Sequence, residues 1–143
     1  MRTYQFIKNQ NGEVVNVDKI TAVSFDYVQK PYEIRVYTPA TKFGIAFHYD
    51  NIEKMCRAVN NLEQVMCITC NLRIVKFANW WIAADGIESI SDCASGIRVR
   101  MDNGQNFDIM IESHEEIKAT KQEIEASLVR MCVLKDLDVD DGE

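Results

Sequence analysis

Val17-Asp18-Lys19-Ile20-Thr21-Ala22-Val23 recurs in similar form later in the chain, as Ala84-Asp85-Gly86-Ile87-Glu88-Ser89-Ile90. Further similar segments follow each of them. Ile34-Arg35-Val36 matches Ile97-Arg98-Val99, and Phe43-Gly44-Ile45-Ala46-Phe47 matches Phe107-Asp108-Ile109-Met110-Ile111. The separation stays at about 63 to 67 residues, as small loop insertions allow. The sequence therefore predicts a tandem duplication of one small unit.

The composition is typical of a globular protein with a sizeable core. The chain has 143 residues, of which 47% are hydrophobic. The N-terminus lacks the apolar run of a signal peptide, and no stretch approaches the roughly 18 apolar residues that a membrane span needs. Five cysteines are an odd number, which favours reduced thiols over a disulfide framework. We therefore expect a cytoplasmic location and no membrane association.

The negative charge is concentrated in the second half of the chain. Residues 1–70 carry eight Lys and Arg against seven Asp and Glu, whereas residues 71–143 carry eight against fifteen, which accounts for the net charge of −6. Proteins that bind the phosphate backbone usually show a basic excess or a stripe of Lys and Arg. Direct binding of nucleic acid is therefore disfavoured.

Alternating apolar residues, turn residues and caps predict the elements of each unit. The first unit has a hairpin with a two-residue turn at Asn11-Gly12, three further strands up to Phe47, and a helix over about 51–63 that Asp50 and Glu53 begin as a capping box. The second unit has strands over about 73–77, 80–83, 87–92, 97–101 and 107–111. A longer helix over about 114–133 follows, which Ser113 and Glu116 cap.

These elements predict an α+β fold: a tandem duplication of a small antiparallel β-sheet unit, each closed by a C-terminal amphipathic helix. The first repeat covers residues 1–66, the second covers 71–134, and an acidic flexible tail covers 135–143. The joining segment over residues 64–70 is mostly apolar, so the repeats are expected to share a core. One continuous sheet with both helices on one face is favoured over two separate sheets.

Cys67-Ile68-Thr69-Cys70 has the spacing of a zinc knuckle or a redox pair. Zinc needs about four ligands, and no second paired motif supplies the other two. A thioredoxin-like pair would begin a helix within a βαβ unit, which this pattern does not predict. Structural thiols are therefore favoured over metal binding and over redox chemistry, and we expect no metal and no cofactor.

Adjacent strand residues point to opposite faces, so only one residue of Trp80-Trp81 is expected in a given core. The other tryptophan would be covered by the second helix, anchor a protein interface, or stack on a base. The first two alternatives are favoured over the third. The candidate partner-binding residues are the two tryptophans and three acidic side chains of the second repeat: Trp80, Trp81, Asp102, Asp108 and Glu112.

Four basic or titratable residues are candidates for binding a small anionic ligand. His48 and His114 each lie near the junction between a last strand and a helix, and we expect them to occupy equivalent places. Arg98 and Arg100 alternate with apolar residues, so they are expected on the outer face of their strand. A nucleotide at the junction between the repeats would meet these side chains.

The sequence contains no signature of nucleophilic catalysis, of a phosphate-binding loop or of a zinc protease. Glu115-Glu116 is a pair of carboxylates in a first helical turn, where acidic residues complement the helix dipole. The leading hypothesis is a non-enzymatic cytoplasmic protein-interaction module that forms a homodimer. One alternative is a phage or mobile-element inhibitor, which covers a host nucleic-acid-binding protein with an acidic surface. The other alternative is a small-ligand protein that binds a nucleotide.

Overall fold

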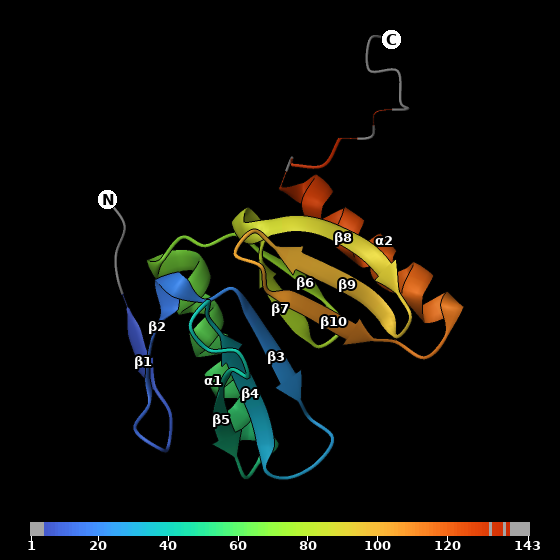
Figure 1. Cartoon of the computed structure of the whole chain (residues 1–143). Helices are drawn as coiled ribbons and strands as arrows, with labels where there is room; N and C mark the ends of the chain where they lie inside the picture. Colours follow the sequence, from blue (N-terminus) through green and yellow to red (C-terminus); the bar gives the residue numbers. More distant parts are fainter. Residues whose placement is uncertain (1–4, 132, 136, 138–143) are drawn as a thin grey trace.

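The structure, a computed structural model, describes residues 5–131, 133–135 and 137 (Figure 1). It is an α+β fold with antiparallel sheets and two α-helices, of which α2 lies nearest the C-terminus. The elements are β1 (Phe6–Lys8), β2 (Val14–Asn16), η1 (Val17–Lys19), β3 (Ala22–Asp26), β4 (Tyr32–Tyr37), β5 (Ile45–Tyr49), α1 (Ile52–Gln64), η2 (Val65–Thr69), β6 (Ile74–Phe77), β7 (Trp80–Ala83), η3 (Ala84–Gly86), β8 (Ile87–Cys93), β9 (Gly96–Met101), β10 (Asn106–Met110) and α2 (His114–Arg130). Part of the predicted tail, residues 136 and 138–143, lies outside the described residues, as does Cys132.

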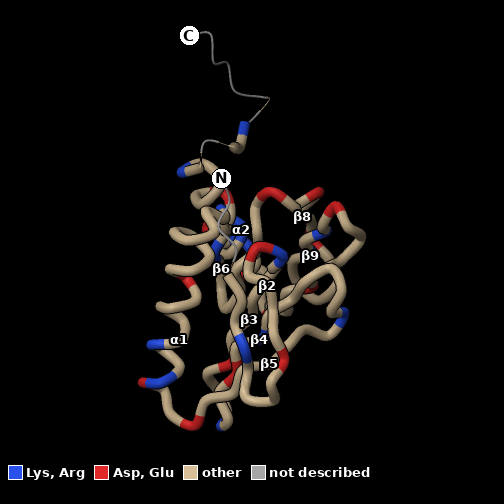
Figure 2. The backbone as a smooth tube through the Cα atoms, turned by 90° about the vertical axis from the view of Figure 1, so that its left-hand side faces the viewer, with Lys and Arg blue, Asp and Glu red and all other residues tan. Residues whose placement is uncertain are grey.

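The described strands form three antiparallel sheets. β1 pairs with β2, a second sheet has the order β5-β4-β3-β7-β6, and a third has the order β10-β9-β8. The expectation of one continuous sheet is therefore wrong. The β6–β7 hairpin joins the strands of the first half, whereas β8, β9 and β10 form a sheet of their own. Both helices lie on the same side of the strands, as Figure 2 shows.

The two halves of the chain present the same order of elements. A hairpin, a 3-10 turn, three antiparallel strands and a helix follow one another as β1 to α1 and again as β6 to α2. The strand registers correspond as well: Val23 lies opposite Val36 as Ile90 lies opposite Val99. Residues that hold the same position in the two halves are called matching residues here.

One sequence match is wrong in register. Phe107 lies opposite Val99, and Ile45 lies opposite Val36, so Phe107 matches Ile45 and not Phe43. Phe43 precedes β5, because Gly44 at φ 79° places a turn there. The apolar pattern of this segment therefore begins two residues before its strand.

The hairpins at Asn11-Gly12 and Asn103-Gly104 both have three-residue loops, so the two-residue turn expected at Asn11-Gly12 is wrong. The Asn9 N–H donates to the Glu13 carbonyl at 3.0 Å, and the Met101 N–H donates to the Gln105 carbonyl at 2.8 Å. The last loop residue of each is a glycine, Gly12 at φ 83° and Gly104 at φ 92°. A left-handed residue at this position is typical of three-residue hairpin loops, which explains why Asn-Gly occurs at both.

Side-chain caps begin both helices. The Asn51 side chain accepts a hydrogen bond from the Lys54 N–H, and the Ser113 side chain accepts one from the Glu116 N–H. The predicted cap at Ser113 is therefore confirmed. The predicted cap at Asp50 is wrong, because the next residue, Asn51, has the extended backbone and the side-chain hydrogen bond of the N-cap. Among the described residues, no helix has both the length and the apolar character that crossing a bilayer requires.

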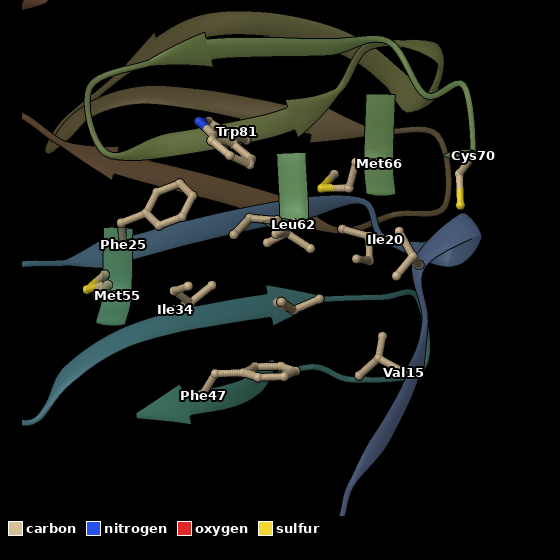
Figure 3. Close-up of a cluster of buried hydrophobic side chains, with 13 residues drawn as sticks. Val15, Ile20, Phe25, Ile34, Phe47, Met55, Leu62, Met66, Cys70 and Trp81 are labelled. Carbon is tan, nitrogen blue, oxygen red and sulfur yellow. The ribbon is translucent and has the colours of Figure 1, made fainter. Parts of the chain in front are cut away.

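The buried side chains form two clusters, and the β6–β7 hairpin contributes to both. Val75, Phe77 and Ile82 belong to the cluster of the second half. Trp81 points to the other side, into the cluster that contains Phe25 and the helix residues Met55 and Leu62 (Figure 3). The second half of the chain therefore completes the core of the first half.

Candidate interaction site at strand β8 and helix α2

Strand β8 is one of the two edge strands of its sheet. Within the described part of the chain it pairs with β9 alone. Its matching strand, β3, pairs with β4 on one side and with β7 on the other. The Phe25 N–H donates to the Asn79 carbonyl at 3.0 Å, and the Ala83 N–H donates to the Thr21 carbonyl at 2.9 Å. An unpaired strand edge offers such groups to an added strand, so β8 is a candidate docking edge.

A groove of about 350 Å³ runs between β8 and α2. Its apolar lining consists of Ile87, Ile90, Ile124, Leu128 and Leu134. Its polar lining consists of Glu88, Ser89, Lys121 and Glu125. An apolar floor with a polar rim next to a free strand edge is the surface that an extended peptide with a projecting apolar side chain occupies.

The matching place in the first half is filled by Trp81. This side chain is 9% exposed and makes an edge-to-face contact with Phe25, with 4.8 Å between the ring centroids. Val23, which lies opposite Trp81, and Ile20 are both buried, whereas their matching residues Ile90 and Ile87 are only half-buried. Through this correspondence of residues, the groove beside Ile90 matches the place that the Trp81 side chain takes beside Val23 in the first half.

An acidic helix residue lies near Trp81 in the first half and at the groove in the second. In the first half, Lys76 on β6 forms an ion pair with Glu63 on α1 and lies 5.1 Å from the centre of the Trp81 ring. Burial lowers the pKa of Lys76. Counted from the two N-caps, Glu63 and Glu125 hold the same helix position. Glu125 lines the groove and forms no ion pair among the residues that the structure describes.

The two predicted tryptophans contribute to the interior contacts of the two halves. Trp80 is half-buried and stacks on Tyr37, with ring centroids 5.6 Å apart, and it also lies 5.7 Å from the Phe107 ring. Trp81 is buried in the other cluster. Tyr37 belongs to β4 and Phe107 to β10, so Trp80 joins strands from both halves.

The three predicted acidic residues are distributed over the surface of the second half. Asp102 follows β9, Asp108 lies on β10, and Glu112 precedes α2, all of them exposed. Asp108 accepts hydrogen bonds of 2.7 and 3.0 Å from Arg98, which lower its pKa. Of the three carboxylates, that of Asp108 is therefore already in an ion pair, with Arg98.

The structure does not bring the four predicted ligand residues together. His48 lies on β5, where its Nε2 is 3.2 Å from Glu33 Oε1, whereas His114 is the first residue of α2. The expectation that the two histidines are equivalent is wrong, because one precedes its N-cap and the other follows it. Arg98 and Arg100 do lie on the exposed face of β9 as expected, paired with Asp108 and Glu88.

The histidines line separate hollows. His48 lines one of about 680 Å³ with Lys54 and Arg57, and His114 lines one of about 380 Å³ with Lys118.

Cys67 and Cys70 lie in and directly after η2, the segment that follows α1. Cys70 is 1% exposed within the first core cluster. Cys67 is half-buried in η2, a π-helical segment, and burial raises the pKa of its thiol. Among the described residues, no three His, Cys, Asp or Glu side chains gather closely enough to hold a metal ion.

The residues of the groove were not predicted as a site. Ile87 and Ile90 were expected simply as strand residues, and Leu128 as part of the longer helix over about 114–133. A usable signal was present in the polarity of β8, which carries Ser89 and Asp92 where β3 has Ala22 and Phe25. A strand that is more polar than the strand it matches is typical of a sheet edge.

The chain matches no known protein-family model and no curated protein sequence.

Proposed function

We propose that this chain is a non-enzymatic protein-interaction module that binds an extended segment of a partner along β8. The segment adds a strand to the β10-β9-β8 sheet and inserts an apolar side chain between β8 and α2. Main-chain hydrogen bonds supply affinity in this mode of recognition, and the groove selects the side chain.

The observation that carries the proposal is the contrast between the two halves. β3 has a strand at its edge and a tryptophan above it, whereas β8 has a free edge and an apolar groove. The first half thus provides, within this chain, the arrangement that a bound partner would create in the second.

We also infer that the chain arose by tandem duplication of a unit made of a hairpin, a 3-10 turn, three strands and a helix. Support comes from the repeated order of elements, the corresponding registers of β3–β4 and β8–β9, and the caps at Asn51 and Ser113. On this view each helix closes the sheet unit that precedes it, with residues such as Leu62 and Ile124.

The experiment compares partners that co-purify with three forms of the full chain, measured by quantitative mass spectrometry. Ile90→Pro removes one main-chain donor from β8. The matching residue Val23 is opposite Trp81. Two residues before it, the Thr21 carbonyl accepts from the Ala83 N–H, and two residues after it, the Phe25 N–H donates to the Asn79 carbonyl, so the backbone groups of Val23 face β7 and those of Ile90 face the free edge. We expect proteins bound by the wild type to be lost from Ile90→Pro.

Met110→Asp is the matched control, because Met110 is 81% exposed on β10, the opposite edge strand of the same sheet. Its partners should equal those of the wild type. Equal recovery of the same partners by all three forms would rule out β8 as the site. Circular dichroism and thermal melting of each form check that it is folded.

The hollow around His48 supports a second candidate, the binding of a small anion. Its lining includes Lys54 and Arg57 from α1 beside Gln10 and Tyr49. A nucleotide that binds there at about 100 times its Kd should add about 2.7 kcal/mol to the free energy of unfolding. Thermal melting with and without nucleotides, on the wild type and on Arg57→Ala, tests this candidate, and an unchanged Tm in the wild type excludes the nucleotides tried.

A further inference from the structure

We infer that the segment bound at β8 is the β1–β2 hairpin of a second copy of this chain. The inference rests on the proposed function, because it names the partner for the same edge and groove. Within one chain, the β6–β7 hairpin of the second half docks on β3 of the first half. The β1–β2 hairpin holds the matching position in the first half, and β8 holds the position of β3 in the second.

The two hairpins have corresponding registers. Ile7 lies opposite Val15 as Val75 lies opposite Ile82, and Lys8 lies opposite Val14 as Lys76 lies opposite Trp81. Val14 therefore matches the tryptophan that fills the first core. An added β2 strand would place Val14 opposite Ile90, just as Trp81 lies opposite Val23.

The backbone of β2 has its free hydrogen-bonding groups at the required positions. The Val17 N–H donates to the Gln5 carbonyl, and the Glu13 carbonyl accepts from the Asn9 N–H, so these β2 positions face β1. Because successive residues of a strand direct their backbone groups to opposite sides, those of Val14 and Asn16 face away from β1. The matching residue of Asn16 is Ala83, whose N–H donates to the carbonyl of Thr21, the residue before β3.

The outward face of the hairpin carries exposed apolar side chains. Phe6 is 57% exposed and Val14 is 58% exposed. Their matching residues, Ile74 and Trp81, both pack in or against the first core cluster. Docking along β8 would therefore cover two exposed apolar side chains and the groove in one step.

The charges are complementary at the position that the first half uses. Lys8 matches Lys76, and Glu125 matches Glu63, the two members of the ion pair between β6 and α1. Neither Lys8 nor Glu125 forms an ion pair among the described residues. An ion pair between Lys8 of one copy and Glu125 of the other would reproduce the internal contact.

The occupant must come from another copy, because the hairpin is held on its own half. The Asn9 side chain donates to the Ala46 carbonyl at 2.8 Å, and the Gln10 side chain bonds both backbone groups of His48 on β5. In Figure 1 the hairpin stands at one side of the molecule, whereas β8 runs along the top. A hairpin on one copy and a groove on the next form a head-to-tail contact, which produces closed rings or open chains.

The test uses two variants that each lose one half of this contact. Val14→Asp alters the hairpin and keeps β8, whereas Ile90→Pro alters β8 and keeps the hairpin. Each protein is first measured by itself by sedimentation and native mass spectrometry over about 10 μM to 1 mM, the range of weak complexes. The wild type should show species heavier than the 16.4 kDa monomer, and each single variant should not. An equimolar mixture of the variants should form a complex of two chains that grows no further, because it has only one intact contact.

Charge reversal provides a second test with variants of exposed residues, which keep the fold. Lys8→Glu alone and Glu125→Lys alone should each weaken the wild-type association by roughly five- to ten-fold, and the double variant should recover most of the loss. Val28→Asp is the control, because Val28 is 87% exposed in the β3–β4 loop and should leave the association unchanged.

The inference is overturned if the wild type is monomeric throughout the concentration range, or if the mixed variants do not associate. The interaction proposal has a separate outcome: loss of a foreign protein from Ile90→Pro but not from Val14→Asp would retain the β8 site and reject the second copy as its occupant. If association persists in every variant, the copies meet through another surface and the inference is wrong.

Discussion

Replacement of Trp81 by alanine is expected to destabilise the whole chain, although the residue lies in the sequence of the second half. Trp81 is 9% exposed and belongs to the core cluster of the first half. Burial of a large aromatic side chain removes roughly 150–250 Å² from water. At about 25 cal/mol per Å², this corresponds to roughly 4–6 kcal/mol.

Measured truncations of this kind agree with that magnitude. A buried Phe or Trp replaced by alanine typically costs about 3–5 kcal/mol, which includes the cavity that remains. The edge-to-face contact with Phe25, at 4.8 Å between centroids, is also lost. We therefore expect Trp81→Ala to lower the free energy of unfolding by about 4–5 kcal/mol, a large part of the roughly 5–15 kcal/mol that a domain possesses.

Urea unfolding at low protein concentration, followed by circular dichroism and tyrosine fluorescence, is the assay. Because β7 belongs to the same sheet as β3 and packs on both clusters, the two signals should change together in one transition. Val28→Ala, at an 87% exposed position, should change stability by less than about 0.5 kcal/mol. A cost below about 1 kcal/mol for Trp81→Ala, or two separated transitions, would refute the reasoning.

Three further predictions follow from single contacts. Gly96→Ala should lower the free energy of unfolding by at least about 3 kcal/mol, because the added Cβ would overlap the Ile109 carbonyl oxygen. At Gly104 the added Cβ has open space, so Gly104→Ala should cost about 1 kcal/mol from its backbone angle alone. Thermal melting of both variants measures the difference, and equal costs would contradict this prediction. Gln105→Ala should lower the free energy of unfolding by about 1–3 kcal/mol, because the Gln105 side chain hydrogen-bonds the Thr38 carbonyl and the Thr21 hydroxyl of the other half at 2.9 Å each. The control Asn103→Ala changes only the loop itself and should cost less in the same urea assay. Arg98→Ala should raise the pKa of Asp108 towards its ordinary value in a carbon-13 NMR titration. Since pairing lowers the folded pKa of Asp108, its contribution to stability is present at neutral pH and is lost as the pH falls through that folded pKa, and an unchanged pKa in Arg98→Ala would exclude Arg98 as the cause.

The local elements were largely predictable from the sequence. Asn-Gly at two loops, the cap at Ser113 and the alternation of Arg98 and Arg100 with apolar residues each act over a few neighbouring residues. Propensity, capping and period are local properties, so a single chain reveals them. The misplaced cap at Asp50 and the misplaced match at Phe43 are errors of one or two residues at element ends, where local preferences are weakest.

Long-range pairing decided the rest, because no local signal states which strand lies beside another. The β6–β7 hairpin pairs with β3 from the other half of the sequence, which places it in a different sheet from β8, β9 and β10 and buries Trp81. The same pairing leaves β8 without a neighbour and opens the groove beside α2. By itself the sequence determined the order and kind of the elements. Tertiary structure alone decided that two similar halves have different surroundings, because β7 cannot pair along β3 and along β8 at the same time.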